Sequence, residues 1–308
     1  MNAVLVHLAS GIGNIVLATP LLIALARRGL EVDVLVDGDY AQTADLLMGW
    51  SAVRAVFNGS LRQRPVGPYD IVVPGIPPFY WHRYRAQYAG DRRCLARPPD
   101  TLFYQDEQRY YLEFARKLGC DVEPPPAYFL PIQADETRGV SANTLVIAPG
   151  CKSGEMAAKR WPFFPRLAEA FQDVVLVGTP DDLRTYDGRP ICFPTHVRSF
   201  VDQLTIRETA EVMAAAGVVV ANDSGLAHIA GAVGVPTVMI FGPTPDLTLG
   251  GLPPNVEVLR AALPCEPCWF ARRFEACNGR IDCLAQVHVD NVVQAIRRAL
   301  SESRLRLV

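Results

Sequence analysis

The clearest chemical signal in this 308-residue chain is the run Asn-Asp-Ser-Gly-Leu-Ala-His at residues 222–228. An apolar run comes directly before it and predicts a buried strand, and Asp223 or Ser224 can cap a helix that begins at Gly225. The free backbone N–H groups at a helix start carry partial positive charge and suit a phosphate or diphosphate. The run therefore predicts an anion site, with a plain helix cap and a His228 packed inside the helix as the alternative.

A second signal is the placement of lysine, because only three of the 30 basic residues are lysines. Lys152 and Lys159 follow the apolar run 144–148, which predicts a strand, and Ser153 lies beside the first of them. Ammonium groups at a strand end can hold a diphosphate leaving group by direct charge. Solvated surface charge is the alternative, but the scarcity of lysine elsewhere favours the binding role.

A third signal is the stiff turn of Gly242, Pro243 and Thr244, which follows the predicted strand 237–240. Glycine and proline are common in turns that have no function. In a functional interpretation, the Gly242 amide and the Thr244 hydroxyl contact the same ligand as the helix start.

Near the beginning of the chain, Gly11-Ile12-Gly13-Asn14 looks at first like a dinucleotide-binding fingerprint. The third glycine of that pattern is missing, since Val16 occupies its place, and no Walker lysine follows. The passage therefore disfavours a nicotinamide enzyme. It predicts a turn from a strand into a helix, with Asn14 as the helix cap.

Four cysteines lie within 19 residues in the spacing Cys-x2-Cys-x8-Cys-x5-Cys, and they are Cys265, Cys268, Cys277 and Cys283. Four thiolates can make a tetrahedral zinc site of a structural kind. The second pair does not have the Cys-x2-Cys spacing of a zinc knuckle, so cysteines that bind no metal remain the alternative.

Residues 79–97 mix arginines with aromatic residues. Such a surface can bind a phosphorylated sugar, a lipid head group or a nucleic acid strand. An amphipathic helix whose arginine stems lie along its surface explains the composition equally well. The residues concerned are Phe79, Tyr80, Trp81, Arg83, Tyr84, Arg85, Tyr88, Arg92, Arg93 and Arg97.

The elements that must position these groups alternate between short apolar strands and helices, which is typical of βαβ units and parallel sheets. The alternation stops in a proline-rich segment near residues 124–142 and then restarts. We therefore predict an α/β protein with two doubly wound domains, residues 1–135 and 136–308, and we leave open that the last helix packs back on the first domain. Ligands are expected outside the carboxyl ends of the strands, in a cleft.

Composition limits the class of protein. Half of the residues are hydrophobic and 20% are charged, which excludes a disordered chain, and the formal net charge of −2 disfavours a nucleic acid partner. No run approaches the roughly 18 apolar residues of a membrane span, and no positive charge precedes the apolar run 15–26 as it would in a secretory signal. We expect a cytoplasmic protein, with peripheral contact at the inner face of a membrane as an option.

Taken in order, these motifs resemble the heptosyltransferases of glycosyltransferase family 9. The motifs that carry the resemblance are Gly-Ile-Gly-Asn at 11–14, Lys-Arg-Trp-Pro at 159–162, the run at 222–230 and Phe-Gly-Pro-Thr at 241–244. The resemblance implies a GT-B fold of two Rossmann-like domains, the first for the acceptor and the second for a nucleotide-sugar. It also implies inverting, metal-independent transfer of a heptose-like sugar, usually from an ADP-sugar, to a glycan or glycolipid of lipopolysaccharide.

Carried over by position, the resemblance assigns Lys159 to the phosphate of the donor. With the residues identified above, the expected donor site comprises Gly13, Lys152, Ser153, Lys159, Asn222, Asp223, Ser224, Gly225, His228, Gly242, Pro243 and Thr244.

One departure from the family concerns the catalytic base. Family members carry an aspartate after the first glycine turn, where this chain has Asn14. An amide can orient a hydroxyl but cannot accept its proton at neutral pH. His7 and Asp39, both near strand ends, are the candidates for a replacement base. The alternatives are a different acceptor, such as a small glycoside or a nucleic acid, and a homologue that binds the nucleotide-sugar without transferring it.

Overall fold

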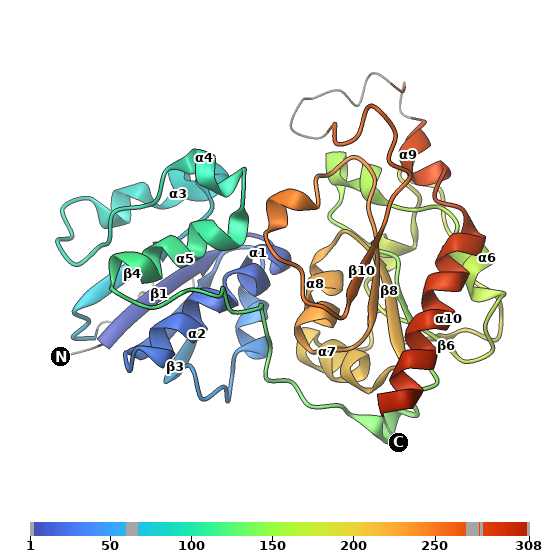
Figure 1. Cartoon of the computed structure of the whole chain (residues 1–308), viewed down its shortest axis with the longest axis horizontal. Helices are drawn as coiled ribbons and strands as arrows, with labels where there is room; N and C mark the ends of the chain where they lie inside the picture. The colour runs from blue at the N-terminus through green and yellow to red at the C-terminus, as the bar shows by residue number, and fades with distance from the viewer. Residues whose placement is uncertain (1–2, 60–66, 269–276, 278–279, 307–308) are drawn as a thin grey trace. The chain divides into compact units, whose positions relative to one another are not determined.

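The computed structural model describes residues 3–59, 67–268, 277 and 280–306. The chain forms two compact α/β units (Figure 1). Unit 1 comprises Met1–Pro131 together with Leu247–Leu252, and unit 2 comprises Ile132–Asp246 together with Pro253–Val308.

Unit 1 is built on a parallel sheet with the strand order β3-β2-β1-β4. The strands are β1 (Ala3–Ala9), β2 (Glu31–Asp37), β3 (Ala55–Gly59) and β4 (Ile71–Gly75). The helices are α1 (Ile12–Leu17), α2 (Thr19–Arg27), α3 (Pro78–Tyr88), α4 (Asp100–Phe103) and α5 (Glu107–Lys117), with 3₁₀ helices η1 (Ala41–Leu46) and η5 (Leu247–Leu249). The inner strand β1 is almost entirely apolar and buried, as is typical of a parallel sheet that is covered on both faces.

The segment Leu247–Leu252 belongs to unit 1 although it lies between two strands of unit 2 in the chain. Its backbone is held by one side chain of α5, since Gln108 Nε2 donates to the carbonyl oxygens of Leu249 at 2.7 Å and Gly251 at 2.8 Å. The chain therefore passes between the units three times.

The aromatic and arginine stretch forms part of the core of unit 1. Tyr80, Tyr84 and Tyr88, spaced by four residues along α3, are all buried on one face of the helix. The guanidinium of Arg83 lies over the Tyr80 ring, 4.6 Å from its centre, in a cation–π contact. The interpretation as an amphipathic helix therefore accounts for these tyrosines.

Unit 2 is built on a parallel sheet with the strand order β10-β9-β8-β5-β6-β7. The strands are β5 (Leu145–Ala148), β6 (Val174–Leu176), β7 (Arg198–Ser199), β8 (Val218–Asn222), β9 (Thr237–Ile240) and β10 (Val256–Leu259). The helices are α6 (Phe164–Ala168), α7 (Ile206–Ala215), α8 (Gly225–Ala232), α9 (Asp282–Ala285) and α10 (Val289–Arg306), with 3₁₀ helices η2 (Glu136–Arg138), η3 (Gly154–Lys159) and η4 (Pro180–Leu183).

The closing helix α10 runs along unit 2 (Figure 1), where it contacts α6, β8 and β9. Its side chains Val292, Ala295 and Ile296 are buried in the core of this unit. Packing on the first domain, which the sequence left open, is not needed to cover its apolar face. In the part of the chain that is described, no helix is both long enough and apolar enough to cross a membrane.

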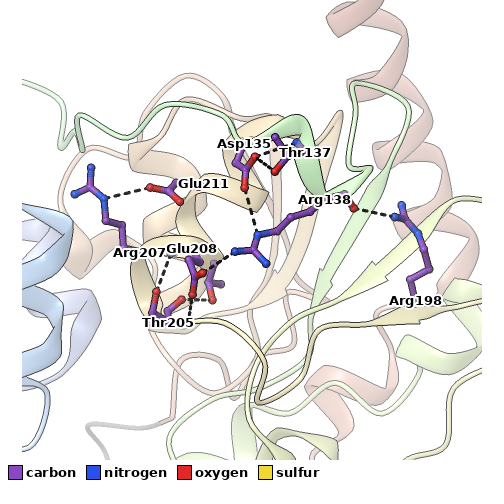
Figure 2. Close-up of polar contacts among 9 residues, drawn as sticks. Asp135, Thr137, Arg138, Arg198, Thr205, Arg207, Glu208 and Glu211 are labelled. Atoms are coloured by element: carbon purple, nitrogen blue, oxygen red, sulfur yellow. Dashed lines mark hydrogen bonds and ion pairs between the residues drawn. The ribbon is translucent and has the colours of Figure 1, made fainter.

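The proline-rich joint is attached at both of its ends. On the side of unit 2, Arg138 pairs with Glu208 of α7 at 2.6 Å and with Asp135 at 3.3 Å (Figure 2). On the side of unit 1, the Phe129 N–H donates to Thr19 Oγ1 at 3.1 Å, between the buried side chains of Tyr128 and Leu130. The proline-rich joint predicted over residues 124–142 is therefore held by these contacts at both ends. Only the short segment between Leu130 and Asp135 lies between them.

We predict that Gly217→Ala destabilises unit 2 by about 1–3 kcal/mol, the usual cost of overpacking. A Cβ atom at Gly217 would lie 2.1 Å from the carbonyl oxygen of Ala142 and 2.7 Å from Leu300 of α10, so backbone must move. The free energy of unfolding in urea measures the effect. Gly251→Ala is the control, because its Cβ would meet no atom within 4 Å; equal losses in both variants would contradict the prediction.

Candidate functional site

The carboxylate of Asp223 is a buried charge directly after β8, and three other segments supply its neighbours. Lys159 Nζ donates to Asp223 Oδ2 at 3.0 Å, and Thr244 Oγ1 donates to the same oxygen at 2.7 Å. His228 Nε2 lies 3.8 Å from Oδ1, which is longer than a hydrogen bond. The structure thus brings together four of the side chains that the sequence assigned to one site.

The charges of this cluster balance internally. Burial alone would raise the pKa of Asp223, but the Lys159 ammonium and the Thr244 hydroxyl act against it, and the pKa is lowered overall. Burial lowers the pKa of His228 to about 4, against the opposing effect of Asp223. At neutral pH the cluster therefore contains one ammonium, one carboxylate and one neutral imidazole.

The helix α8 begins at this cluster without a side-chain cap. Ser224 is the N-cap by backbone position, but its side chain makes no capping bond, and within the described residues its Oγ atom is buried without a hydrogen-bond partner. The predicted helix start at Gly225 with Ser224 as the N-cap residue is confirmed, but neither candidate side chain makes a capping bond, and Asp223 contacts Lys159 and Thr244 instead. The N–H groups of the first turn, from Gly225 onward, are consequently not satisfied by a side-chain cap.

Asn222, which the sequence assigned to the donor site, is buried behind that site. Its side chain is fully buried, with Nδ2 donating to the carbonyl oxygen of Pro149 at 2.5 Å and Oδ1 accepting from the Trp161 backbone N–H at 2.9 Å. It therefore joins the ends of β8 and β5 and fixes the segment that carries Lys159. Asn222 is a positioning residue here, not one that can touch a ligand.

The loop after β5 separates the two lysines. Lys152 is exposed, and the neighbouring Ser153 donates its hydroxyl to Asp181, which also accepts from Arg160 at 3.1 Å. Only Lys159 contacts Asp223 among the lysines of the described residues. The structure therefore does not bring Lys152 and Ser153 into the Asp223 cluster.

The turn after β9 is held from behind by the cysteine-rich segment. The Cys268 N–H donates to the carbonyl oxygen of Pro243 at 2.9 Å. A Cβ atom at Gly242 would lie 2.7 Å from Leu284 and 3.2 Å from the sulfur of Cys283, so a larger residue here would displace the Leu284 side chain. These contacts fix the position from which Thr244 reaches Asp223.

The zinc site predicted at the four cysteines stays a prediction. In the described part of the chain, no group of three or more His, Cys, Asp or Glu side chains could hold a metal ion. Burial, with the carboxylate of Glu266 nearby, raises the pKa of the Cys283 thiol to about 12. The loop 269–276 between Cys268 and Cys277 lies outside the described residues.

A second polar group forms in unit 1, at the turn after β1. The helix α1 begins at Ile12 with Gly11 as its N-cap, so Asn14 is not the cap but lies in the first turn. Asn14 Oδ1 accepts from Ser10 Oγ at 2.9 Å and from the Gly11 N–H at 3.2 Å. Gly13, assigned to the donor site from the sequence, is a residue of α1 in unit 1 and no part of the Asp223 cluster.

The two candidates for a replacement base are poorly placed for that role. His7 is 0% exposed, with Nδ1 against the hydroxyl of Tyr88 and Nε2 3.5 Å from Asp37, so an acceptor cannot reach its ring. Asp39 is at the opposite extreme, with 68% of its side chain exposed and Arg83 3.9 Å away. The burial of His7 contradicts it as the base, and among the described residues Asp39 pairs with Arg83 and not with Asn14.

Sequence reasoning missed Glu107, the first residue of α5. This residue is 6% exposed, and its Oε1 atom accepts from Asn14 Nδ2 at 2.7 Å. The two residues are 93 positions apart. An acidic residue in the first turn of a helix is ordinary, so the sequence near residue 107 carried no signal of this contact.

Comparison with known proteins identifies relatives of this site and fold. Residues 108–277, more than half of the chain, match the family described as glycosyltransferase family 9 (heptosyltransferase). Lipooligosaccharide heptosyltransferase 2 of Haemophilus influenzae is 35% identical over 106 residues, which are 31% of this chain and 30% of that protein. The match thus spans less than a third of the length of that curated relative.

Two solved structures share the fold over nearly the whole chain. The ADP-heptose LPS heptosyltransferase II of E. coli has a TM-score of 0.70 at 18% identity, covering 98% of this chain and 99% of that one. A heptosyltransferase of E. coli solved with ADP has a TM-score of 0.63 at 18% identity, covering 96% of this chain and 99% of that one. At this identity the likeness shows a shared GT-B architecture.

We predict that His228 makes the stability of unit 2 fall in mild acid. Its pKa is about 4 in the folded protein and about 6.5 when unfolded, so the unfolded state binds more protons between these values. The free energy of unfolding should drop by about 3 kcal/mol as the pH falls from about 6.5 to about 4. Urea unfolding of wild type and His228→Gln at both ends of this range measures the difference.

The exposed His288 provides the control, since His288→Gln should keep the full acid-dependent loss. A His228→Gln protein with the same pH dependence as wild type would contradict the assignment of that loss to this imidazole.

Proposed function

Because the chain belongs to glycosyltransferase family 9, we propose that it moves a heptose-like sugar from an ADP-sugar to a hydroxyl of a glycan or glycolipid. We further propose that the transfer inverts the anomeric carbon and needs no metal ion. Unit 2 would bind the nucleotide-sugar and unit 1 the acceptor, a role compatible with contact at a membrane surface.

The observation that carries this proposal is the Asp223 cluster at the start of α8. One ammonium group and an uncapped helix start lie at the same strand end. The uncapped helix start favours a negatively charged group, and Lys159, which Asp223 already pairs, lies beside it. A nucleoside diphosphate is the negatively charged group that leaves in this reaction. The heptosyltransferase of E. coli that shares this fold was solved with ADP, which supports an ADP-sugar as donor.

The proposed mechanism is a direct displacement through a transition state with oxocarbenium character. As the bond from the anomeric carbon to the diphosphate breaks, negative charge develops on the leaving phosphate. Lys159 and the N–H groups of α8 would stabilise that charge, since preorganised donors act most strongly where charge develops. Thr244 and Asp223 would hold the ammonium in place, and the neutral His228 adds no competing charge.

Binding of ADP provides a first test. We expect Lys159→Met to weaken ADP binding by about 10- to 100-fold, because a charge-assisted hydrogen bond contributes about 1.5–3 kcal/mol. Isothermal titration with ADP measures the change. The double variant Lys159→Met/Asp223→Asn removes the buried charge that the single change leaves unpaired, and it should bind ADP as weakly while remaining folded.

The matched control is Lys117→Met, which removes a lysine of α5 in unit 1 whose ammonium binds the Ala96 carbonyl oxygen. ADP affinity in this variant should equal that of wild type. Wild-type affinity for ADP in the Lys159 variants, or no ADP binding by wild type, would contradict the donor site.

Transfer itself is tested with ADP-heptose and lipopolysaccharide that lacks heptose, in the presence of excess EDTA. We expect ADP release to depend on the acceptor and to be unchanged by the chelator. Binding of ADP-heptose without any turnover would instead indicate a nucleotide-sugar-binding homologue, and a loss of activity with EDTA would overturn metal independence.

A further inference from the structure

The polar group at the turn after β1 contains a carboxylate in a defined setting. Glu107 is the first residue of α5, where the helix dipole stabilises negative charge. One of its oxygens accepts from Asn14 Nδ2 at 2.7 Å, and the carboxylate also hydrogen-bonds the buried phenol of Tyr111, whose pKa is raised well above its ordinary value, chiefly by burial. Both partners are uncharged groups that donate to the carboxyl oxygens of Glu107.

Asn14 has its orientation fixed by two donors. Its Oδ1 atom accepts from the Ser10 hydroxyl and the Gly11 N–H, so its NH₂ group faces Glu107. Ser10, which supplies one of these bonds, has a φ angle of 107°, a conformation that costs free energy for any residue except glycine. The strained turn therefore holds an amide and a carboxylate side by side at the end of β1.

Asn14 and Glu107 together can both orient a hydroxyl and accept its proton. The amide of Asn14 can orient a hydroxyl but cannot accept its proton, whereas a carboxylate can. Of the carboxylates near this turn, Asp37 is buried against His7, and Asp39 is exposed and pairs with Arg83. Glu107 is the one that Asn14 contacts directly.

We propose that Glu107 is the catalytic base of the transfer reaction, with Asn14 as the group that positions its carboxylate and the acceptor hydroxyl. This inference rests on the proposed function. In the step, the acceptor oxygen forms a bond to the anomeric carbon of the donor while the bond from that carbon to the diphosphate breaks. The hydroxyl proton passes to the Glu107 carboxylate, ADP leaves with the bonding electron pair, and Glu107 then returns its proton to water.

The decisive variant is Glu107→Gln, because glutamine can still accept the hydrogen bond from Asn14 but cannot take a proton. With ADP-heptose and heptose-free lipopolysaccharide as probes, we expect kcat for ADP release to fall by about 10²–10⁴-fold, the usual contribution of a general base. The KM for ADP-heptose should change less than about twofold, since unit 2 holds the donor site. Glu113→Gln, the same change on the same helix in a residue paired with Arg116, should retain wild-type kcat.

A second variant separates catalysis from structure. Glu107→Gln/Asn14→Asp exchanges the carboxylate and the amide, so their hydrogen bond is kept and a base is returned to the turn. We expect this double variant to recover at least tenfold in kcat over Glu107→Gln. A merely structural role for Glu107 predicts no loss in the single variant and no gain in the double variant.

The outcomes separate the two proposals. Turnover by wild type, loss in Glu107→Gln and recovery in the exchange variant would support Glu107 as the base. Turnover by wild type with an unchanged Glu107→Gln, or without recovery in the exchange variant, would overturn this inference and leave the proposed function intact. A wild-type protein that binds ADP but never releases it from ADP-heptose would overturn both.

Discussion

Burial of the Asp223 carboxylate is the constraint on which the arrangement of unit 2 depends. A charge removed from water is costly unless it is paired and hydrogen-bonded. Lys159 and Thr244 supply the partners, so the end of β8, the 3₁₀ helix η3 and the turn after β9 must meet at one point. Asn222 and the cysteine-rich segment, which bind no part of that charge themselves, hold two of these segments in place. The polar cluster and its supports therefore act as one unit of structure.

Both polar groups lie where the strand order of a parallel sheet reverses. In unit 2 the first strand, β5, has β6 on one side and β8 on the other, and Asn222 bridges the ends of β5 and β8. In unit 1 the first strand, β1, has β2 and β4 as neighbours, and the turn with Asn14 follows it. Loops leave such a point in opposite directions, which opens room at the carboxyl ends of the strands. The topology thus explains why chemistry gathers at these two turns.

Sequence reasoning succeeded where a signal is local and failed where a contact is distant. The parallel α/β class and the Asp223, His228 and Thr244 group follow from apolar runs that end in polar residues, because strand ends meet at one edge of a sheet. The solvent exposure of a side chain could not be predicted in this way. The sequence places His7 near the end of a strand, but Tyr84 and Tyr88 of α3 cover its ring. The contact from Asn14 to Glu107 depends on how α5 returns to β1, and no spacing along the chain encodes that distance.

The membership of Leu247–Leu252 in unit 1 has a consequence for the order in which the protein can form during synthesis. Residues 132–246, which include β5 to β9, are made before the segment whose carbonyl groups bind Gln108. These 115 residues take about 6–23 s at about 5–20 residues per second. For that time the start of α5, next to Glu107, lacks its final partners. The last segment of unit 1 is therefore synthesised only after five of the six described strands of unit 2.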